Sequence, residues 1–151
     1  MQMKQPEPGL VIRFAYLWRS EAAVGRDEAA KDRPCAVVVA TTRQDGNLTV
    51  YVAPITHTPP GNPLHAIEIP AGTKRRLGLD DARSWIVTTE VNGFTWPGPD
   101  LRPIGRGADR GFIYGPLPRS MTVDLVRAIR EHIREGRAKI IGRDEKPVGG
   151  G

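Results

Sequence analysis

The strongest constraint on the fold is a pair of apolar runs at residues 35–41 and 48–56, which are separated by the turn residues Asp45 and Gly46. Both runs are rich in β-branched side chains, which is typical of strands. An Asp-Gly pair favours a two-residue type I′ turn, because that turn requires positive φ at both central positions. The segment therefore predicts a β-hairpin, and we expect the rest of the chain to be organised around a sheet.

The register of this hairpin brings two polar residues together. A two-residue turn pairs Cys35 with Thr56, so Arg33 shares a face of the sheet with Thr56 as a diagonal pair about 7–8 Å apart. His57 falls on the opposite face if the strand continues that far, because side chains alternate along a strand. The spacing thus favours Arg33 and Thr56, rather than His57, as the central polar pair. On spacing alone, however, an Arg-Pro pair can simply begin a strand at a surface.

Outside the hairpin, four more segments have the composition of short strands: residues 10–18, 65–69, 84–91 and 111–117. The third of these is expected to end at Asn92-Gly93, and "KRRLGL" predicts one helical turn. Further on, apolar residues recur at intervals of three and four, which predicts an amphipathic helix capped by Ser120 or Thr122 and ended by Gly136. The pattern predicts five or six short strands in an antiparallel, barrel-like sheet closed by this helix. That is a mainly β fold of the α+β class.

The length of 151 residues suits a single domain. We expect this domain to span residues 9–142, between a flexible N-terminal arm at 1–8 and a flexible tail at 143–151. The charged segment 19–32 lacks large apolar anchors, so it is expected to form a long functional loop or a short exposed helix.

Composition limits the environment and the partners. The net charge of +5 and a sequence pI of about 9.8 permit a polyanionic partner without identifying one. No apolar run approaches the roughly 20 residues of a membrane helix, and the N-terminus lacks an apolar signal segment, so we expect a cytoplasmic protein without membrane contact. The single cysteine, Cys35, is expected to be a small buried hydrophobic residue. No cysteine–histidine cluster has zinc-site spacing, so we expect no metal and no cofactor.

The hairpin sequence resembles a known family. "RPCAVVVA" followed by "VYVAPIT" is similar to the core of the MazF/PemK family of toxin–antitoxin endoribonucleases, and the order of the other segments is similar over roughly residues 9–135. The segment "TWPGPDLRP" resembles a PemK-like subgroup. The resemblance implies a small SH3-like antiparallel barrel with a C-terminal helix, as in MazF, PemK and CcdB-like proteins.

The resemblance also implies a chemistry. The family cuts single-stranded RNA at specific sequences without a metal, and the products carry a 2′,3′-cyclic phosphate and a 5′-hydroxyl. The resemblance assigns the catalytic roles to Arg33 and Thr56. The planar guanidinium of Arg33 offers several donors that suit phosphate oxygens, and the hydroxyl of Thr56 can donate a hydrogen bond to the developing negative charge. The base for the 2′-hydroxyl stays open between His57, Glu90 and Asp100.

RNA binding requires basic groups for phosphates and aromatic faces for bases. The candidates for substrate contact are His57, Arg26, Lys31, Trp96, Asp100 and Arg102. Trp96 could equally belong to the core.

The family resemblance further implies a homodimer and a small, often acidic antitoxin as partner. Two other classes remain open: a toxin of the same fold that poisons DNA gyrase without being an enzyme, and a noncatalytic nucleic-acid-binding barrel.

Overall fold

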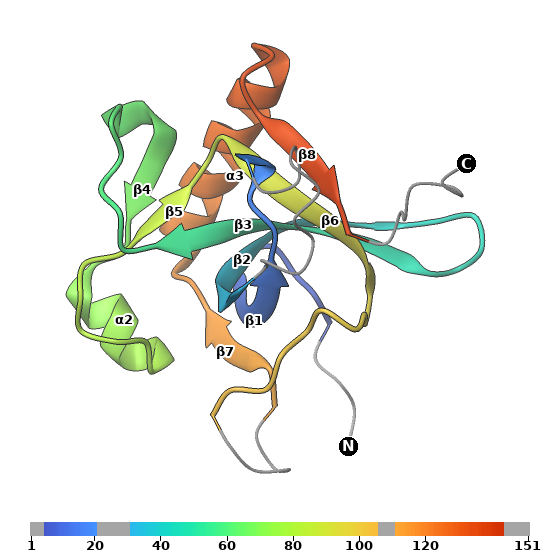
Figure 1. Cartoon of the computed structure of the whole chain (residues 1–151), viewed down its shortest axis with the longest axis horizontal. Coiled ribbons are helices and arrows are strands. Elements are labelled where there is room, and N and C mark those ends of the chain that lie inside the picture. The colour runs from blue at the N-terminus through green and yellow to red at the C-terminus, as the bar shows by residue number, and fades with distance from the viewer. Residues whose placement is uncertain (1–4, 21–30, 106–110, 144–151) are drawn as a thin grey trace.

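The computed structural model describes residues 5–20, 31–105 and 111–143 (Figure 1). Within the described residues the fold is mainly β, as the sequence predicts, and it includes two helices of a full turn or more. The strands are β1 (Leu10–Tyr16), β2 (Lys31–Thr42), β3 (Leu48–Thr56), β4 (Ala66–Glu68), β5 (Trp85–Val87), β6 (Glu90–Trp96), β7 (Ile113–Pro116) and β8 (Lys139–Gly142). The helical elements are the 3-10 turn η2 (Pro63–His65), α2 (Ala71–Leu77) and α3 (Arg119–Arg134).

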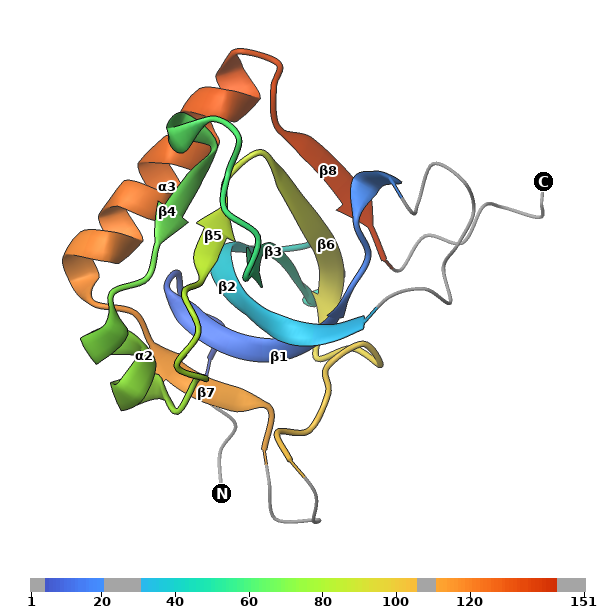
Figure 2. The same cartoon turned by 60° about the vertical axis from the view of Figure 1, so that its left-hand side comes forward.

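The strands form one branched sheet in the order β4-β5-β3-β2-β1-β7. Strand β3 is the branch point, because its first half pairs with β6 and its last two residues pair with β5. All these pairings are antiparallel except that of β8, which lies parallel to β6 (Figures 1 and 2). Within the described residues the two ends of the sheet do not pair, so the sheet is open rather than a closed barrel.

The sheet nevertheless curls strongly around one face. Phe14 on β1 and Phe94 on β6 are separated by two intervening strands, yet their ring centroids lie only 4.5 Å apart. Both rings belong to a hydrophobic cluster formed by the inward side chains of β1, β2, β3 and β6. Its buried members are Leu10, Ile12, Phe14, Tyr16, Cys35, Val37, Val50, Val52, Phe94 and Trp96. We call it the inner cluster. Cys35 is fully buried within it, which confirms the prediction for this residue.

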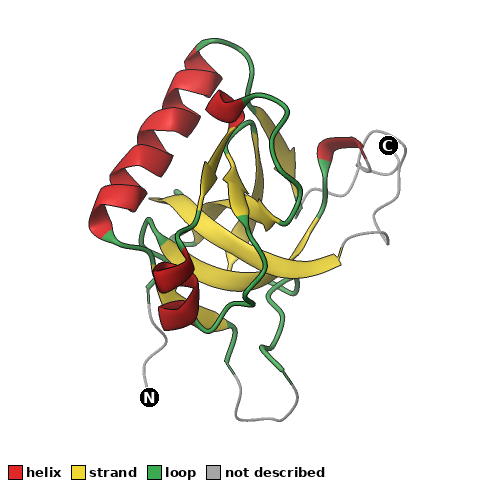
Figure 3. Ribbon diagram, turned by 90° about the vertical axis from the view of Figure 1, so that its left-hand side faces the viewer, coloured by secondary structure: helices red, strands yellow, loops and turns green. Residues whose placement is uncertain are grey.

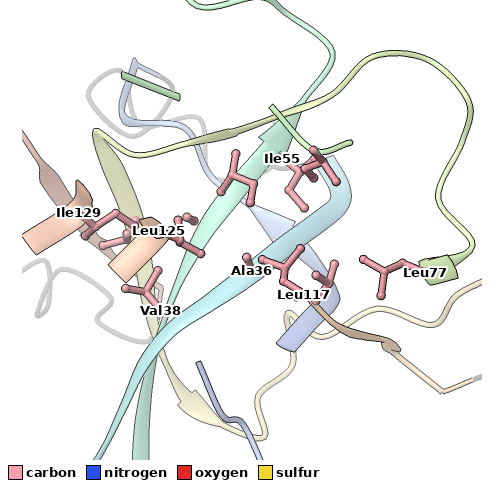
Figure 4. Packing of buried hydrophobic residues seen from close by; sticks show 12 residues of the cluster. Ala36, Val38, Ile55, Leu77, Leu117, Leu125 and Ile129 are labelled. Atoms are coloured by element: carbon pink, nitrogen blue, oxygen red, sulfur yellow. The ribbon is translucent and has the colours of Figure 1, made fainter. Parts of the chain in front are cut away.

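The opposite face of the sheet is covered by α3, which runs along one side of the strands (Figure 3). Leu125 and Ile129 of α3 pack towards Ala36 and Val38 of β2, and Leu77 of α2 lies at the other end of the same cluster (Figure 4). Because both faces of β2 are buried, its sequence reads as a continuous apolar run rather than an alternating one.

The hairpin turn differs from the predicted type. Arg43 N–H donates to the Asn47 carbonyl and Gly46 N–H donates to the Arg43 carbonyl, so the loop holds Gln44, Asp45 and Gly46. Only Gly46 has positive φ, at 87°, which excludes a type I′ turn and matches a type I turn followed by a glycine. The Asp45 carboxylate accepts the Asn47 N–H at 3.0 Å and so stabilises this longer loop.

The register changes a second time within the strands. Val39 pairs with Tyr51, but Val37 pairs with Val52, so Val38 is an extra residue at a β-bulge. The longer loop and the bulge each shift β2 by one residue relative to β3, and the two shifts together return the side chains before Val38 to their predicted face. Cys35 therefore pairs with Pro54 instead of Thr56.

The predicted strand at 84–91 is two strands, with a break at Thr88 and Thr89. Strand β6 also continues through Asn92-Gly93, where the sequence predicted that the strand would end. Gly93 faces Tyr51, and a Cβ at this glycine would lie 2.7 Å from the Tyr51 ring. The glycine is thus required for close approach between β3 and β6 rather than for a turn.

The ends of the described chain are tied to the sheet more closely than expected. Pro6, in the predicted arm, is buried, and Arg143, the first residue of the predicted tail, donates its N–H to the Gly93 carbonyl. Strand β8 is an element that the sequence did not predict. Helix α3 has no side-chain cap at its N-terminus, because Pro118 is the N-cap residue. The predicted caps Ser120 and Thr122 both lie inside the helix, where Thr122 donates its hydroxyl to the Pro118 carbonyl. Among the described residues no helix combines the length and apolar character needed to cross a membrane.

Candidate active site

Arg33 and Thr56 line two neighbouring cavities. The first cavity has a volume of about 450 Å³ and the second about 410 Å³. Continuing the register of the Cys35–Pro54 pair by two residues places Arg33 opposite Thr56. The predicted pair thus forms a wall common to both cavities. Arg33 lies inside β2, paired with Phe14 of β1, rather than just before the strand as its sequence position suggested.

Arg33 is held in place by an aromatic ring. Its guanidinium carbon lies 5.1 Å from the centroid of the Trp18 ring, a distance at which a cation is attracted to the ring face. The Nε of Arg33 is buried and has no hydrogen-bond partner among the described residues. A buried donor without a partner is costly, so this N–H is a position where a ligand oxygen would be stabilised.

The hydroxyl of Thr56 is oriented by the chain that follows it. Its oxygen accepts the N–H of Thr58 at 3.2 Å. With a lone pair engaged in this way, the hydroxyl hydrogen remains available to donate. Thr56 is the last residue of β3 and pairs with Trp85 of β5, so the sheet fixes its backbone.

The position of Trp18 depends on Asn92, where the sequence predicted the end of a strand. Asn92 is fully buried, and its side chain accepts the Leu17 N–H at 2.8 Å and donates to the Leu17 carbonyl at 2.9 Å. This pair of bonds continues β1 by one residue and sets Trp18 beside the site. Trp18 also packs edge-on against Tyr16, at 5.3 Å between ring centroids.

The first cavity is mainly apolar, and we call it the aromatic cavity. Besides Arg33 and Thr56, its walls include an indole, an imidazole, two prolines and an aliphatic side chain: Trp18, His65, Pro59, Pro60 and Val87. Flat rings and apolar walls suit a nucleobase. Sequence reasoning did not select Trp18, although it is the tryptophan placed beside the predicted pair.

The second cavity is polar, and we call it the charged cavity. Besides Arg33 and Thr56, it is lined by ionisable side chains from β1, β2, β7 and the segments after β3 and α2. These side chains are Arg13, Lys31, Asp32, His57, Asp80 and Tyr114. Lys31 is a predicted substrate contact and does line this cavity. With Arg13, Lys31 and Arg33 on its walls, the cavity suits an anionic group.

The face predicted for His57 assumed that the strand continues to this residue, and the strand does not. Strand β3 ends at Thr56, so His57 lies in the bend beyond it and lines the charged cavity with the predicted pair. Its Nε2 lies 2.8 Å from Oδ2 of Asp80. The other oxygen of Asp80 accepts a hydrogen bond from Lys74 Nζ at 2.7 Å. That bond, followed by the one with His57, lowers the pKa of Asp80 below its usual range, although burial opposes the shift.

Three further predicted contacts, Asp100, Arg102 and Trp96, lie outside both cavities. Asp100 accepts a hydrogen bond from the Arg143 guanidinium at 3.0 Å. Arg102 Nε lies 3.4 Å from the Asp32 carboxylate, so it is linked to the charged cavity through that residue. Trp96 is 8% exposed and packs against Phe94 and Phe112, which makes it a core residue at the far end of β3 from Thr56.

Arg26 falls at a position outside the described residues, so its predicted role has no structural counterpart here. Of the open candidates for the base, Glu90 accepts hydrogen bonds from the Tyr16 hydroxyl and the Arg19 N–H, and lines neither cavity. Burial raises the pKa of the Cys35 thiol, which keeps this residue protonated and unreactive.

A further hollow of about 720 Å³ lies over β3, β6 and β8, and neither Arg33 nor Thr56 lines it. Within the described residues, no group of three or more histidine, cysteine or acidic side chains is arranged to hold a metal ion. No protein-family model matches this chain, and no curated protein matches it.

Proposed function

We propose that this protein is a sequence-specific endoribonuclease that cuts single-stranded RNA without a metal and acts as the toxin of a type II toxin–antitoxin system. The observation that carries the proposal is the position of Arg33 and Thr56 as the wall shared by an aromatic and a charged cavity. In this proposal the curled sheet is a small SH3-like barrel of the MazF/PemK type, and the protein works in the cytoplasm.

The two cavities suggest how an RNA strand lies across the site. One nucleobase enters the aromatic cavity, where Trp18 offers a ring face for stacking. A neighbouring phosphate lies over the charged cavity, near Arg13 and Lys31. The phosphate between these two positions then meets Arg33 and Thr56.

The reaction at that phosphate needs little beyond positioned donors and a proton acceptor. The 2′-oxygen bonds to phosphorus, the bond from phosphorus to the 5′-oxygen breaks, and the products are a 2′,3′-cyclic phosphate and a 5′-hydroxyl. Arg33 donates to the non-bridging oxygens, on which negative charge grows, and its unpartnered Nε gains an acceptor. Thr56 donates its hydroxyl hydrogen to the same charge. Removal of one such donor typically costs about 2.7–4 kcal/mol of barrier.

The net charge of +5 also supports the proposed partners. A basic surface speeds the approach of both RNA and an acidic antitoxin segment, because opposite charges steer association. We propose that the chain acts as a homodimer that such an antitoxin silences.

The test is a cleavage assay on defined single-stranded RNA in EDTA, together with a matched strand that carries 2′-deoxyribose throughout. RNA should be cut to 2′,3′-cyclic phosphate ends that mass spectrometry identifies, and the deoxy strand should stay intact because it lacks the nucleophile. The same assay on Arg33→Ala should show that most cleavage is lost. Arg127→Ala is the matched control and should cut normally, since Arg127 is an exposed arginine of α3. Intact RNA together with inhibited supercoiling by gyrase would replace the proposal with the gyrase-poison alternative. Binding of RNA without cleavage would favour a noncatalytic module.

A further inference from the structure

A buried lysine lies next to the charged cavity. Lys74 of α2 is only 4% exposed, and its ammonium group donates to Asp80 Oδ1 at 2.7 Å, to Ser84 Oγ at 2.6 Å and to the Ala82 carbonyl. An ammonium group has three donors, so these three acceptors satisfy it completely. Such a group needs an ionised partner to offset its desolvation, and Asp80 supplies that charge.

The loop after α2 is shaped to bring Asp80 over this lysine. Gly78 ends α2 in the left-handed conformation, at φ 74°, and Leu79 N–H donates to the Lys74 carbonyl. The chain then turns back, and Asp80 Oδ1 accepts both the Lys74 ammonium and the Ala82 N–H. One carboxylate oxygen is thus fixed from two sides, which leaves Oδ2 directed to His57.

His57 is the end of this chain of contacts. Its ring is exposed, and its Nε2 is the atom that meets Asp80. A ring nitrogen that bonds a carboxylate carries a proton, so the other nitrogen, Nδ1, is the one that can accept a proton from a substrate. His57 lines the charged cavity together with Arg33 and Thr56, whereas Glu90 and Asp100 line neither cavity.

We propose that Lys74, Asp80 and His57 act as one unit, in which Lys74 and Asp80 are positioning residues that hold His57 as the general base of the site. This inference depends on the proposed function. In the reaction, His57 Nδ1 takes the proton of the 2′-hydroxyl as the bond from the 2′-oxygen to phosphorus forms. The 5′-oxygen leaves phosphorus with its bonding electron pair and takes a proton from water. Asp80 stabilises the imidazolium that results, as a carboxylate behind a histidine does in other proton-transfer sites.

The other charged groups around His57 are consistent with this role. The cavity walls that face it carry Arg13, Lys31 and Arg33 as cations and Asp32 as a second anion, with the hydroxyl of Tyr114 among them. The cations suit the substrate phosphate rather than the imidazole. Asp80 is the carboxylate within hydrogen-bond distance of the His57 ring, so its removal should have the largest electrostatic effect on the base.

The test has one arm without RNA. Nitrogen-15 NMR of the full-length protein, at a pH where the ring is neutral, should show His57 protonated at Nε2 in the wild-type chain. In Asp80→Asn the two tautomers should be mixed, and in Asp81→Asn the spectrum should be unchanged. Asp81 is the adjacent exposed aspartate and does not line the charged cavity, so it is a matched control. Mixed tautomers in the wild-type chain would overturn the positioning role.

The second arm measures RNA cleavage. His57→Ala should lower kcat by about 10²–10⁴-fold, with partial rescue by added imidazole. Asp80→Asn and Lys74→Met should lower kcat by about tenfold or more without a matching change in KM, and should move the pH–rate profile, whereas Asp81→Asn should do neither. Asp80→Asn keeps an oxygen for Lys74, so it tests the unit even if Lys74→Met unfolds.

The outcomes separate this inference from the proposed function. A wild-type protein that cuts RNA, with Asp80→Asn and His57→Ala cutting as fast as Asp81→Asn, overturns the inference and leaves the function intact. A wild-type protein that cuts no RNA overturns both.

Discussion

The guanidinium group of Arg33 lies against the Trp18 ring, at 5.1 Å from carbon to centroid, while its Nε stays without a partner among the described residues. The ring therefore orients the cation without using its donors. This arrangement suits a group that must offer several N–H bonds to an incoming phosphate.

The first prediction concerns this contact. Trp18→Ala should reduce RNA cleavage because Arg33 loses the surface that orients it, and Trp18→Phe should retain more activity because a phenyl ring still attracts a cation. Cation–π contacts of this kind contribute about 0.5–2 kcal/mol, so the loss should be about twofold to thirtyfold. The measurement is kcat/KM on one RNA. Equal activity in Trp18→Ala and the wild type would contradict the prediction.

The second prediction concerns Arg33 and Thr56 themselves. Arg33→Ala and Thr56→Ala should each lower cleavage by about 10²-fold or more. Their melting temperatures should stay near the wild-type value, since neither side chain is fully buried. Arg33→Lys should recover little, because an ammonium group cannot reproduce the planar fork. Thr49→Ala is the matched control: it removes a half-buried threonine from the other end of β3.

The third prediction concerns stability in acid. The pKa of Asp80 is lowered in the folded protein, chiefly by Lys74, so Asp80 stabilises the fold above the unfolded-state pKa of about 3.9 and this contribution is lost as the pH falls through the folded-state pKa. The difference in unfolding free energy between wild type and Asp80→Asn should therefore shrink as the pH falls below about 4. Since the Asp80 side chain is 54% exposed, added salt should also reduce the difference. Denaturant titrations from pH 7 to pH 3 measure it, and a difference that grows in acid would show the sign to be wrong.

The fourth prediction concerns the core beneath α3. Leu125 is completely buried, so Leu125→Ala should lower the free energy of unfolding by about 2–5 kcal/mol through lost burial and a residual cavity. Val123, on the same helix, is 45% exposed, and Val123→Ala should change it far less. Chemical denaturation of both variants provides the comparison. Similar losses in the two would mean that α3 does not pack on the sheet through Leu125.

The fifth prediction concerns assembly. If the protein is a homodimer, sedimentation equilibrium at micromolar concentration should give a mass near twice the 16.6 kDa of one chain. A mass that stays at one chain across the concentration range would contradict it.

Much of the hairpin could be predicted from sequence because its signals are local. The bounds of β3, the mainly β fold and the shared face of Arg33 and Thr56 all follow from apolar runs and a turn signal. The turn type was wrong because the Asp45 side chain favours a longer loop, an effect that the Asp-Gly pair alone does not reveal. The shared face was correct only because the bulge at Val38 offset that error.

The features of the fold and of the site that could not be predicted depend on contacts between segments distant in the sequence. Asn92-Gly93 has the composition of a turn. In the structure, however, Asn92 hydrogen-bonds Leu17, which follows the remote strand β1, and Gly93 lies against the ring of Tyr51. Composition likewise gives no reason to prefer Trp18 over Trp96, because only the curled sheet determines which ring reaches the site. Asp80 lacked a signal for the same reason, because its partner His57 lies on the other side of α2 in the sequence, and Lys74 is linked to His57 only through Asp80.

The bulge at Val38 has a consequence for how this hairpin can change. Deletion of one loop residue, or of Val38 alone, would rotate Arg33 to the helix-covered face of the sheet, while deletion of both would restore it. We therefore expect the hairpin to tolerate insertions and deletions in compensating pairs, because an even number of added or removed residues keeps the arginine on the face that lines the cavity.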